Sequence, residues 1–162
     1  MLYSNNMSVI LSSFKKSKKI LNLFDNIKPY SVSRFNPSGY PYERLEFLSA
    51  YDVNGNRLRL KGSSPEQYRH EWLKYIVKNK EIVFNWLDNL DNNVHILLCC
   101  WCPYSQSIKK QIKNYGSFVC HTGLIGNLIN KYRPDIELIL DKDRVFMLYR
   151  KYLPDNFKNI EV

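Results

Sequence analysis

One short segment, residues 94–99, is apolar at every position except His95. A strand that is apolar on both faces is typical of the centre of a parallel sheet, where helices cover both sides. The polar residues 91–93 precede the segment, and its length suits a strand and not a helix. We therefore expect a buried central strand, and with it a fold in which helices pack on a sheet.

Strand and helix patterns alternate along the rest of the chain. Strands are expected at Met7–Leu11, Pro29–Ser33, Val94–Cys99 and Ile136–Leu140, and helices at Phe14–Phe24, Pro65–Leu90 and His121–Tyr132. Such alternation favours a parallel sheet with right-handed crossovers. The sequence therefore predicts a single α/β domain over residues 1–162, with a mainly parallel sheet of about four to five strands.

The boundaries of these elements carry their own signals. Ser64 and Gln67 have the spacing of a capping box, and Pro65 suits the first turn of the long helix that follows. Residues 35–64 contain several turn dipeptides and are expected to form a long loop region, which in a compact domain is usually functional or mobile. Residues 141–162 are expected to form a polar and aromatic C-terminal tail.

Basic charge is concentrated in two blocks of the sequence. The chain carries a net charge of +9, of which residues 1–62 contribute +6 and residues 107–134 contribute +5. Clustered lysines and arginines neutralise phosphates, so the blocks favour an anionic ligand or nucleic acid. Asn, Ile, Lys and Tyr together make up 58 of the 162 residues, a bias that suits an AT-rich coding sequence. A merely solvated basic surface is therefore the alternative.

The apolar segments argue against a membrane protein. None approaches the roughly 20 consecutive apolar residues that a helix needs to cross a bilayer. At the N-terminus the apolar residues 9–11 come before the basic cluster 15–19, which is the reverse of the order in a signal peptide. We therefore expect a cytoplasmic protein, or one in the host cytoplasm if the chain is virus-encoded.

Four cysteines, Cys99, Cys100, Cys102 and Cys120, crowd into one stretch and indicate a site, not the spread disulfide framework of a secreted protein. One alternative is zinc held by Cys100, Cys102, Cys120 and His121, although ligand pairs separated by one residue or none are unusual for zinc. A second is a reactive thiol at Cys120, because the start of a helix stabilises a thiolate and His121 could assist as a base. A third is the packing of small buried thiols.

A second candidate site lies at the carboxyl ends of the expected strands, where parallel sheets bind their ligands. Those ends carry Ser12 and Ser13, Ser33 and Arg34, and the adjacent Cys99 and Cys100. An arginine that faces the start of a helix can hold a phosphate or a carboxylate through two hydrogen bonds. The pattern therefore predicts an anion-binding pocket around Arg34, with an ordinary exposed arginine as the alternative.

At these residues the chain resembles the bacterial and phage family called domain of unknown function 488. The segments that carry the resemblance are, in chain order within residues 7–133, SVILSSFKKSKKIL, PYSVSRF, SSPEQYRHEWLKYI, HILLCCWCP and FVCHTGLIGNLI. The arginine that follows Cys-His in the family is Thr122 here, and the spacer from Cys102 to Cys120 is longer than expected. A weaker similarity, through CWCP and Cys-His, is to domain of unknown function 4326. The resemblance implies a Rossmann-like three-layer domain with no established activity.

Two hypotheses of function follow. The first is a pocket domain that acts on or senses a nucleotide or a related anionic small molecule, with Arg34 as the anion contact and Cys120 and His121 at a reacting centre. The second is a non-catalytic binding module, virus-encoded in one version, that engages nucleic acid or a host protein through the basic blocks. No cofactor is predicted, and zinc is the one alternative.

Overall fold

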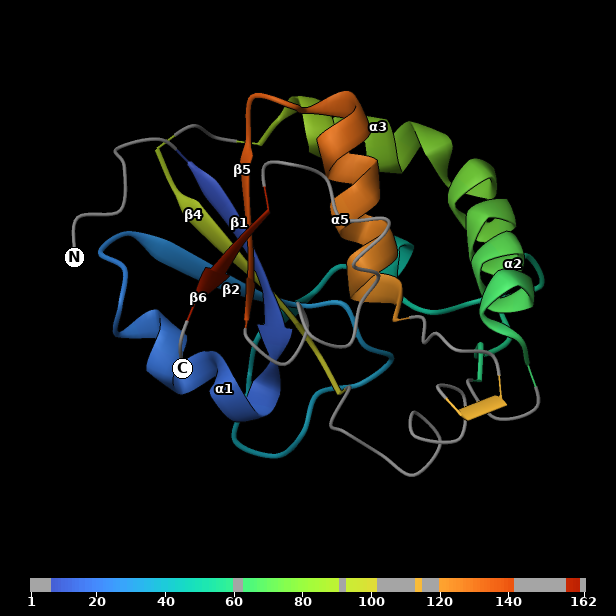
Figure 1. Ribbon diagram of the computed structural model, residues 1–162, viewed down its shortest axis with the longest axis horizontal. Helices are drawn as coiled ribbons and strands as arrows, with labels where there is room; N and C mark the ends of the chain where they lie inside the picture. Colours follow the sequence, from blue (N-terminus) through green and yellow to red (C-terminus); the bar gives the residue numbers. More distant parts are fainter. Residues whose placement is uncertain are drawn as a thin grey trace.

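The computed structural model of the chain describes residues 7–59, 63–90, 93–101, 113–114, 120–141 and 157–160. Within them one sheet has the strand order β3-β2-β4-β1-β5-β6, and all neighbouring strands are parallel (Figure 1). The strands are β1 (Ser8–Ser13), β2 (Ile27–Ser31), β3 (Glu43–Arg44), β4 (His95–Cys100), β5 (Glu137–Asp141) and β6 (Phe157–Ile160). The predicted α/β class with a mainly parallel sheet is confirmed. The sheet is wider than expected because β3 and β6 form in segments without a clear strand pattern.

Helices cover both faces of this sheet. They are α1 (Phe14–Leu21), α2 (Pro65–Lys78), α3 (Lys80–Asp88) and α5 (His121–Tyr132), with a short 3-10 helix, η1 (Glu46–Leu48), after β3. On one face Ile10, Leu97 and Ile139 pack in one cluster with Phe14 and Ile20 of α1. The alternate strand residues pack in a second cluster with α2, α3 and α5, which lie apart from α1 in Figure 1. The predicted three-layer arrangement therefore holds.

The two central strands form a switch point of the chain. β1 pairs with β4 on one side and with β5 on the other, and all six residues of β1 are buried. The chain leaves β1 through α1 towards β2, and leaves β4 towards α5 and β5, so the two connections run in opposite directions along the sheet. Open α/β sheets bind ligands where such connections diverge, outside the carboxyl ends of the strands.

The prediction of one continuous helix over Pro65–Leu90 is wrong in one respect, because the segment forms two helices, α2 and α3, that meet at Asn79. The capping box of Ser64 and Gln67 opens α2 as expected. At Asn79 the side-chain amide donates to the carbonyl oxygen of Tyr75 over 2.9 Å, and the backbone there is not helical, with φ −103° and ψ 19°. The backbone amide of Asn79 also donates to the carbonyls of Tyr75 and Ile76, so the helical hydrogen bonds reach Asn79 and α2 ends at its non-helical backbone.

The second strand lies two residues earlier than the predicted Pro29–Ser33 and contains Pro29 in its middle. The amide of Val32 donates to the carbonyl of Cys99 in β4. Successive backbone nitrogens of a strand face opposite sides, and Pro29 is three residues before Val32, so the nitrogen of Pro29 faces β3. β3 pairs only with Tyr30 and Ser31. The missing N–H of the proline therefore faces a side of the strand where no ladder partner is needed.

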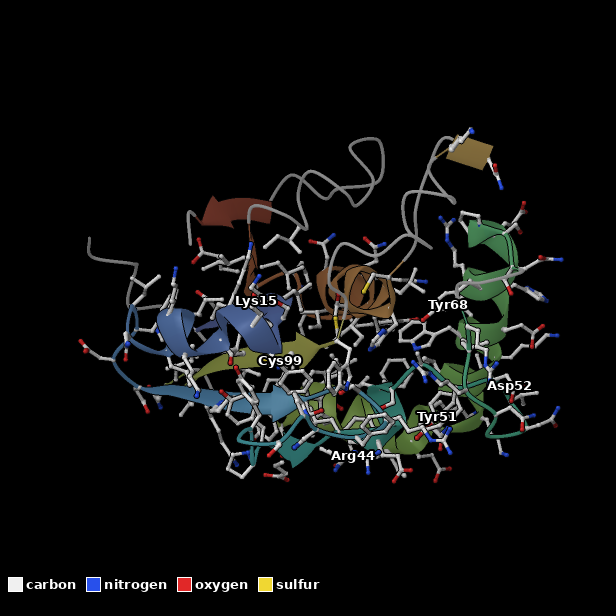
Figure 2. All side chains as sticks on the ribbon, turned by 90° about the horizontal axis from the view of Figure 1, so that it is seen from below. Lys15, Arg44, Tyr51, Asp52, Tyr68 and Cys99 are labelled. Carbon is white, nitrogen blue, oxygen red and sulfur yellow. The ribbon has the colours of Figure 1, made fainter. Side chains whose placement is uncertain are left out.

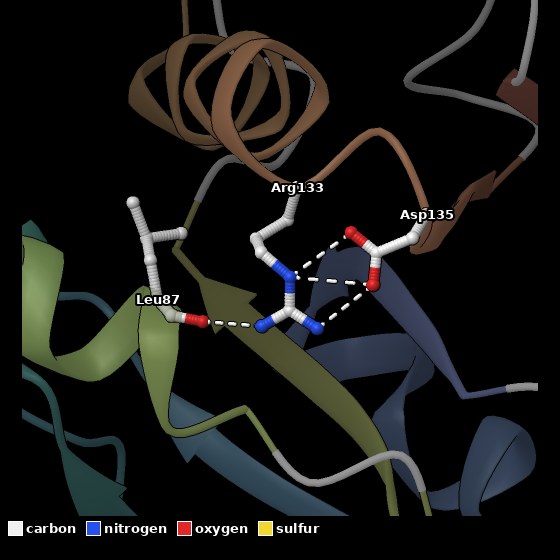
Figure 3. A network of polar contacts seen from close by, with 3 residues as sticks. All are labelled: Leu87, Arg133 and Asp135. Atoms are coloured by element: carbon white, nitrogen blue, oxygen red, sulfur yellow. Dashed lines mark hydrogen bonds and ion pairs between the residues drawn. The ribbon is translucent and has the colours of Figure 1, made fainter.

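Arg133 joins the ends of two helices to the start of β5, as Figure 3 shows. Its Nη1 donates to the carbonyl oxygen of Leu87 in the last turn of α3. Its Nε and Nη2 donate to the two carboxylate oxygens of Asp135 over 3.0 and 2.8 Å.

Across the part of the chain that the structure describes, no helix combines the length and apolar content that crossing a membrane requires.

Candidate functional site

Two of the crowded cysteines meet in the interior, between the end of β4 and the start of α5. The Sγ atoms of Cys100 and Cys120 are 3.9 Å apart, and the exposed fractions of these residues are 0% and 2%. Cys120 is the N-cap residue of α5, as the sequence predicts, and its Sγ lies 3.1 Å from Oγ1 of Thr122. Cys99 is also fully buried, on the face of β4 that α1 covers.

His121 ties α5 to the end of β2. Its Nε2 lies 2.9 Å from the carbonyl oxygen of Val32, and the amide of Val32 donates to the carbonyl of Cys99 over 2.9 Å. A carbonyl oxygen can only accept, so Nε2 carries the proton in this contact. The imidazole is buried, and this nitrogen is occupied by the backbone.

This geometry favours structural roles for the predicted catalytic pair. Cys120 and His121 come together with Cys100 and the end of β2, and both are buried and bound to neighbouring groups of the chain. A catalytic role for the pair stays a prediction. The zinc alternative requires Cys102, which lies outside the described residues. Among those that are described, no three His, Cys, Asp or Glu side chains are placed together to hold a metal ion.

The serines of the predicted anion pocket are buried. Ser12 and Ser13 lie at the end of β1, opposite Cys99 and Cys100, and Ser13 is the N-cap residue of α1 without a capping hydrogen bond from its side chain. Ser33 Oγ donates to the carbonyl oxygen of Phe35 over 3.0 Å, so it shapes the turn that follows β2. The hydroxyl of Ser33 therefore supports a loop of the carboxyl edge, and none of these three serines lines the groove that Arg34 lines.

Arg34 is exposed, and it lines a groove of about 680 Å³ beside the β2–β3 edge of the sheet. We call it the arginine groove, and its lining is Arg34, Arg44, Glu46, Phe47, Tyr51, Gly55, Tyr75, Asn79 and Ile82. Arg34 follows the end of β2, and Arg44 is the last residue of β3. Parallel strands end at the same edge, so both guanidinium groups reach the groove from the carboxyl edge. In Figure 2, Arg44 and Tyr51 lie on the opposite side of Cys99 from Lys15.

Several contacts fix the walls of the arginine groove. Nε of Arg44 donates to the carbonyl oxygen of Ser33 over 3.2 Å, which ties β3 to the turn that carries Arg34. The hydroxyl of Tyr75 donates to the carbonyl oxygen of Glu46 over 2.9 Å. Burial, with a smaller effect of the Glu46 charge, raises the pKa of Tyr75 to about 12. The phenol therefore keeps its proton at neutral pH and stays a donor.

The sequence predicts one residue of this groove and misses the others. Arg34 is found because it follows a strand pattern. Arg44, Phe47 and Tyr51 come from the predicted loop region 35–64, and only the packing of that region on α2 and α3 brings them to Arg34. The two-residue strand β3 is too short to show a periodic pattern. The one available signal is an arginine close to aromatic residues in a turn-rich segment.

Comparisons of the chain with protein-family models, with curated proteins and with solved structures find no match. The resemblance to domain of unknown function 488 therefore stays a prediction, based on the segments quoted above. Function has to be argued from the geometry of the chain itself.

Proposed function

We propose that this protein binds a nucleotide or a related anionic small molecule in the arginine groove. One observation carries the proposal: Arg34 and Arg44, from the ends of two neighbouring strands, line the same groove. Two guanidinium groups that face one space attract an anion and offer it several N–H donors in a planar arrangement. The place is also consistent with the carboxyl edge at which parallel sheets bind ligands.

The rest of the lining suits a ligand with both an anionic and an aromatic part. The volume of about 680 Å³ falls within the range of small-molecule sites. The rings of Tyr51 and Tyr75 are 5.6 Å apart and, with Phe47, give the groove an aromatic wall against which a base can pack. The Glu46 carboxylate and the Asn79 amide can bind ribose hydroxyls or exocyclic amines.

No reaction is assigned to the ligand. The thiols of Cys100 and Cys120 and the imidazole of His121 are buried away from the groove lining, and their contacts join α5 to β2 and β4. The proposal is therefore a binding or sensing function, in which the buried cluster holds the carboxyl edge in shape.

Thermal unfolding in the presence of a nucleotide library tests the proposal. A ligand present at 100 times its dissociation constant should add roughly 2.7 kcal/mol to the free energy of unfolding. Mono-, di- and triphosphates of each base, together with inorganic phosphate and pyrophosphate, separate recognition of the anion from recognition of the base. If none of these compounds raises the unfolding temperature, the proposed ligand class is wrong.

The first variant to examine is Arg34→Lys. An ammonium cannot form the two parallel hydrogen bonds of a guanidinium, and the loss of one charge-assisted hydrogen bond costs roughly 1.5–3 kcal/mol, so ligand binding should weaken at least about tenfold. Arg44→Lys should act in the same direction. Arg59→Lys is the matched control, because Arg59 is exposed and is not part of the groove lining. Equal binding by Arg34→Lys and the control would reduce Arg34 to a general positive charge.

A further inference from the structure

A connected set of aromatic rings lies beside the switch point, and none of these rings lines the arginine groove. We call it the aromatic face, and it consists of Phe14, Phe35, Tyr40, Tyr42 and Trp101. Phe14 directly follows β1, and Trp101 directly follows β4. Neighbouring ring centroids are 5.5–6.0 Å apart, and Trp101 lies against both Phe14 and Phe35. Two of the rings reach solvent, since the exposed fraction is 55% for Phe35 and 45% for Trp101.

Hydrogen bonds within the chain hold these rings in place. Nε1 of Trp101 donates to the carbonyl oxygen of Phe35 over 2.8 Å, and Ser33 Oγ donates to the same oxygen. The hydroxyl of Tyr42 shares a hydrogen bond of 2.8 Å with Oγ of Ser17 in α1. A ligand that stacks on rings already fixed in position loses little side-chain freedom on binding. The aromatic face is therefore prepared for contact with a planar group.

The border of the aromatic face is basic. Lys15, labelled in Figure 2, and Lys18 are exposed on α1, and Nζ of Lys18 lies 5.1 Å from the centroid of the Tyr40 ring. Helix α1 contains four lysines and no acidic residue, and the segment 33–42 contains Arg34 and no acidic residue. Exposed rings with cations beside them complement a ligand that carries planar aromatic groups on a polyanionic backbone.

We propose that the aromatic face binds single-stranded nucleic acid, with bases stacked on Phe35 and Trp101 and phosphates beside Lys15 and Lys18. In a single strand each base has an open face that can stack on a side chain. In a duplex the bases are stacked on one another and do not reach such rings. None of the five rings lines the arginine groove, and Arg34 is the residue that borders both surfaces.

Fluorescence anisotropy of a labelled thymidine oligonucleotide of about 12 nucleotides, a length suited to one such surface, tests this proposal with the full chain. We expect the logarithm of the binding constant to fall linearly with the logarithm of the salt concentration. A duplex of the same length should bind more weakly. Phe35→Leu and Trp101→Leu should each weaken binding by about 5- to 150-fold, the range for the loss of one base stacked on a ring. Lys15→Gln and Lys18→Gln should each lower the salt slope by about 0.7.

Two variants outside the aromatic face serve as controls. Phe84→Leu removes an exposed ring of α3 that contacts Tyr132 of α5. Helix α3 also carries the acidic residues Glu81 and Asp88. Lys74→Gln removes an exposed lysine of α2. Both should bind the oligonucleotide as the unaltered chain does, and so should Arg44→Lys. Circular dichroism and thermal unfolding establish that each variant is folded.

Three results would overturn the proposal. The first is unchanged single-strand binding when Phe35→Leu and Trp101→Leu are combined, because stacking would then contribute nothing. The second is equal affinity for duplex and single strand, with losses only in the lysine variants, which would indicate a basic surface that recognises phosphates and no bases. The third is the absence of any binding at low salt.

Discussion

At the scale of single residues, His95 shows how burial selects a protonation state. It lies at the start of β4, where its Nδ1 accepts a hydrogen bond of 3.1 Å from the amide of Ser8. The hydroxyl of Ser8 donates to the Glu137 carboxylate over 2.9 Å, so the three residues form a row across β4, β1 and β5. Desolvation lowers the pKa of His95, and the charge of Glu137 opposes this effect without cancelling it.

This arrangement predicts a loss of stability in mild acid. In the unfolded chain the pKa of His95 has its ordinary value of 6.5, and in the folded chain it is lower. As the pH falls through 6.5 the unfolded state binds the proton first, so the stabilising contribution is complete above 6.5 and is lost as the pH falls towards the folded pKa. Urea unfolding between about pH 7 and about pH 5 measures the effect.

His95→Asn should flatten that pH dependence, because the amide oxygen of asparagine can replace Nδ1 as an acceptor and does not titrate in this range. His70→Asn is the control, since His70 is exposed on α2. His70→Asn should keep the pH dependence of the unaltered chain. An unchanged slope in His95→Asn would show that another group causes the loss.

At the scale of elements, Arg133 is the clearest single link between helices. It is the C-cap residue of α5, and it binds both the last turn of α3 and Asp135 before β5 (Figure 3). Asp135 is exposed, and exposed ion pairs contribute only about 0–1 kcal/mol. The bond to the Leu87 carbonyl is less accessible to water, and a hydrogen bond from a charged donor contributes roughly 1.5–3 kcal/mol.

We therefore expect Arg133→Ala to lower the free energy of unfolding by about 1.5–3 kcal/mol and Asp135→Asn by at most about 1 kcal/mol. Urea unfolding at neutral pH measures both values. The pKa of Asp135 is lowered by its hydrogen bonds with Arg133, so this carboxylate is charged under those conditions. Equal losses in the two variants would mean that the ion pair, and not the contact with α3, stabilises the structure.

The elements differ in how far local sequence determines them. β4 and α5 could be predicted because a buried strand and an amphipathic helix each show a pattern within the segment itself. The break at Asn79 could not, because it lies at one non-helical residue within an apolar pattern that continues on both sides. β3 and β6 exist because neighbouring strands offer them a ladder, and their own sequences do not mark them as strands.

At the scale of the whole molecule, the sites depend on contacts between distant segments. The sequence places Arg34 and the cysteines at strand ends, but it does not show that the thiols turn inward while Phe35 and Trp101 stay in solvent. Aromatic residues are usually buried, so the exposed rings of the aromatic face carry no local signal. Their position follows from the turn after β2, which Ser33 and Trp101 hold by binding the Phe35 carbonyl.

The same organisation predicts how the thiols become accessible. The side chain of Cys99 lies under α1, where it packs with Phe14 and Ile20, so a reagent reaches it once α1 leaves the sheet. Cys120 is the N-cap residue of α5, and exposing it requires that α5 leave the sheet. Local openings have lower free energies than global unfolding and depend less steeply on denaturant. Cys99 and Cys120 should therefore both be alkylated at urea concentrations below the global unfolding transition.

Alkylation followed by mass spectrometry of peptides measures the rate at each thiol, in a Cys102→Ser background that removes a competing thiol. Without denaturant, Cys99, Cys100 and Cys120 should all react far more slowly than free cysteine, because their exposed fractions are 0%, 0% and 2%. With rising urea, the rates at Cys99 and Cys120 should depend on denaturant less steeply than the equilibrium constant of global unfolding does, because α1 covers the first thiol and α5 carries the second. Rapid labelling of Cys120 in the folded chain would contradict its burial and would restore the reactive-thiol hypothesis.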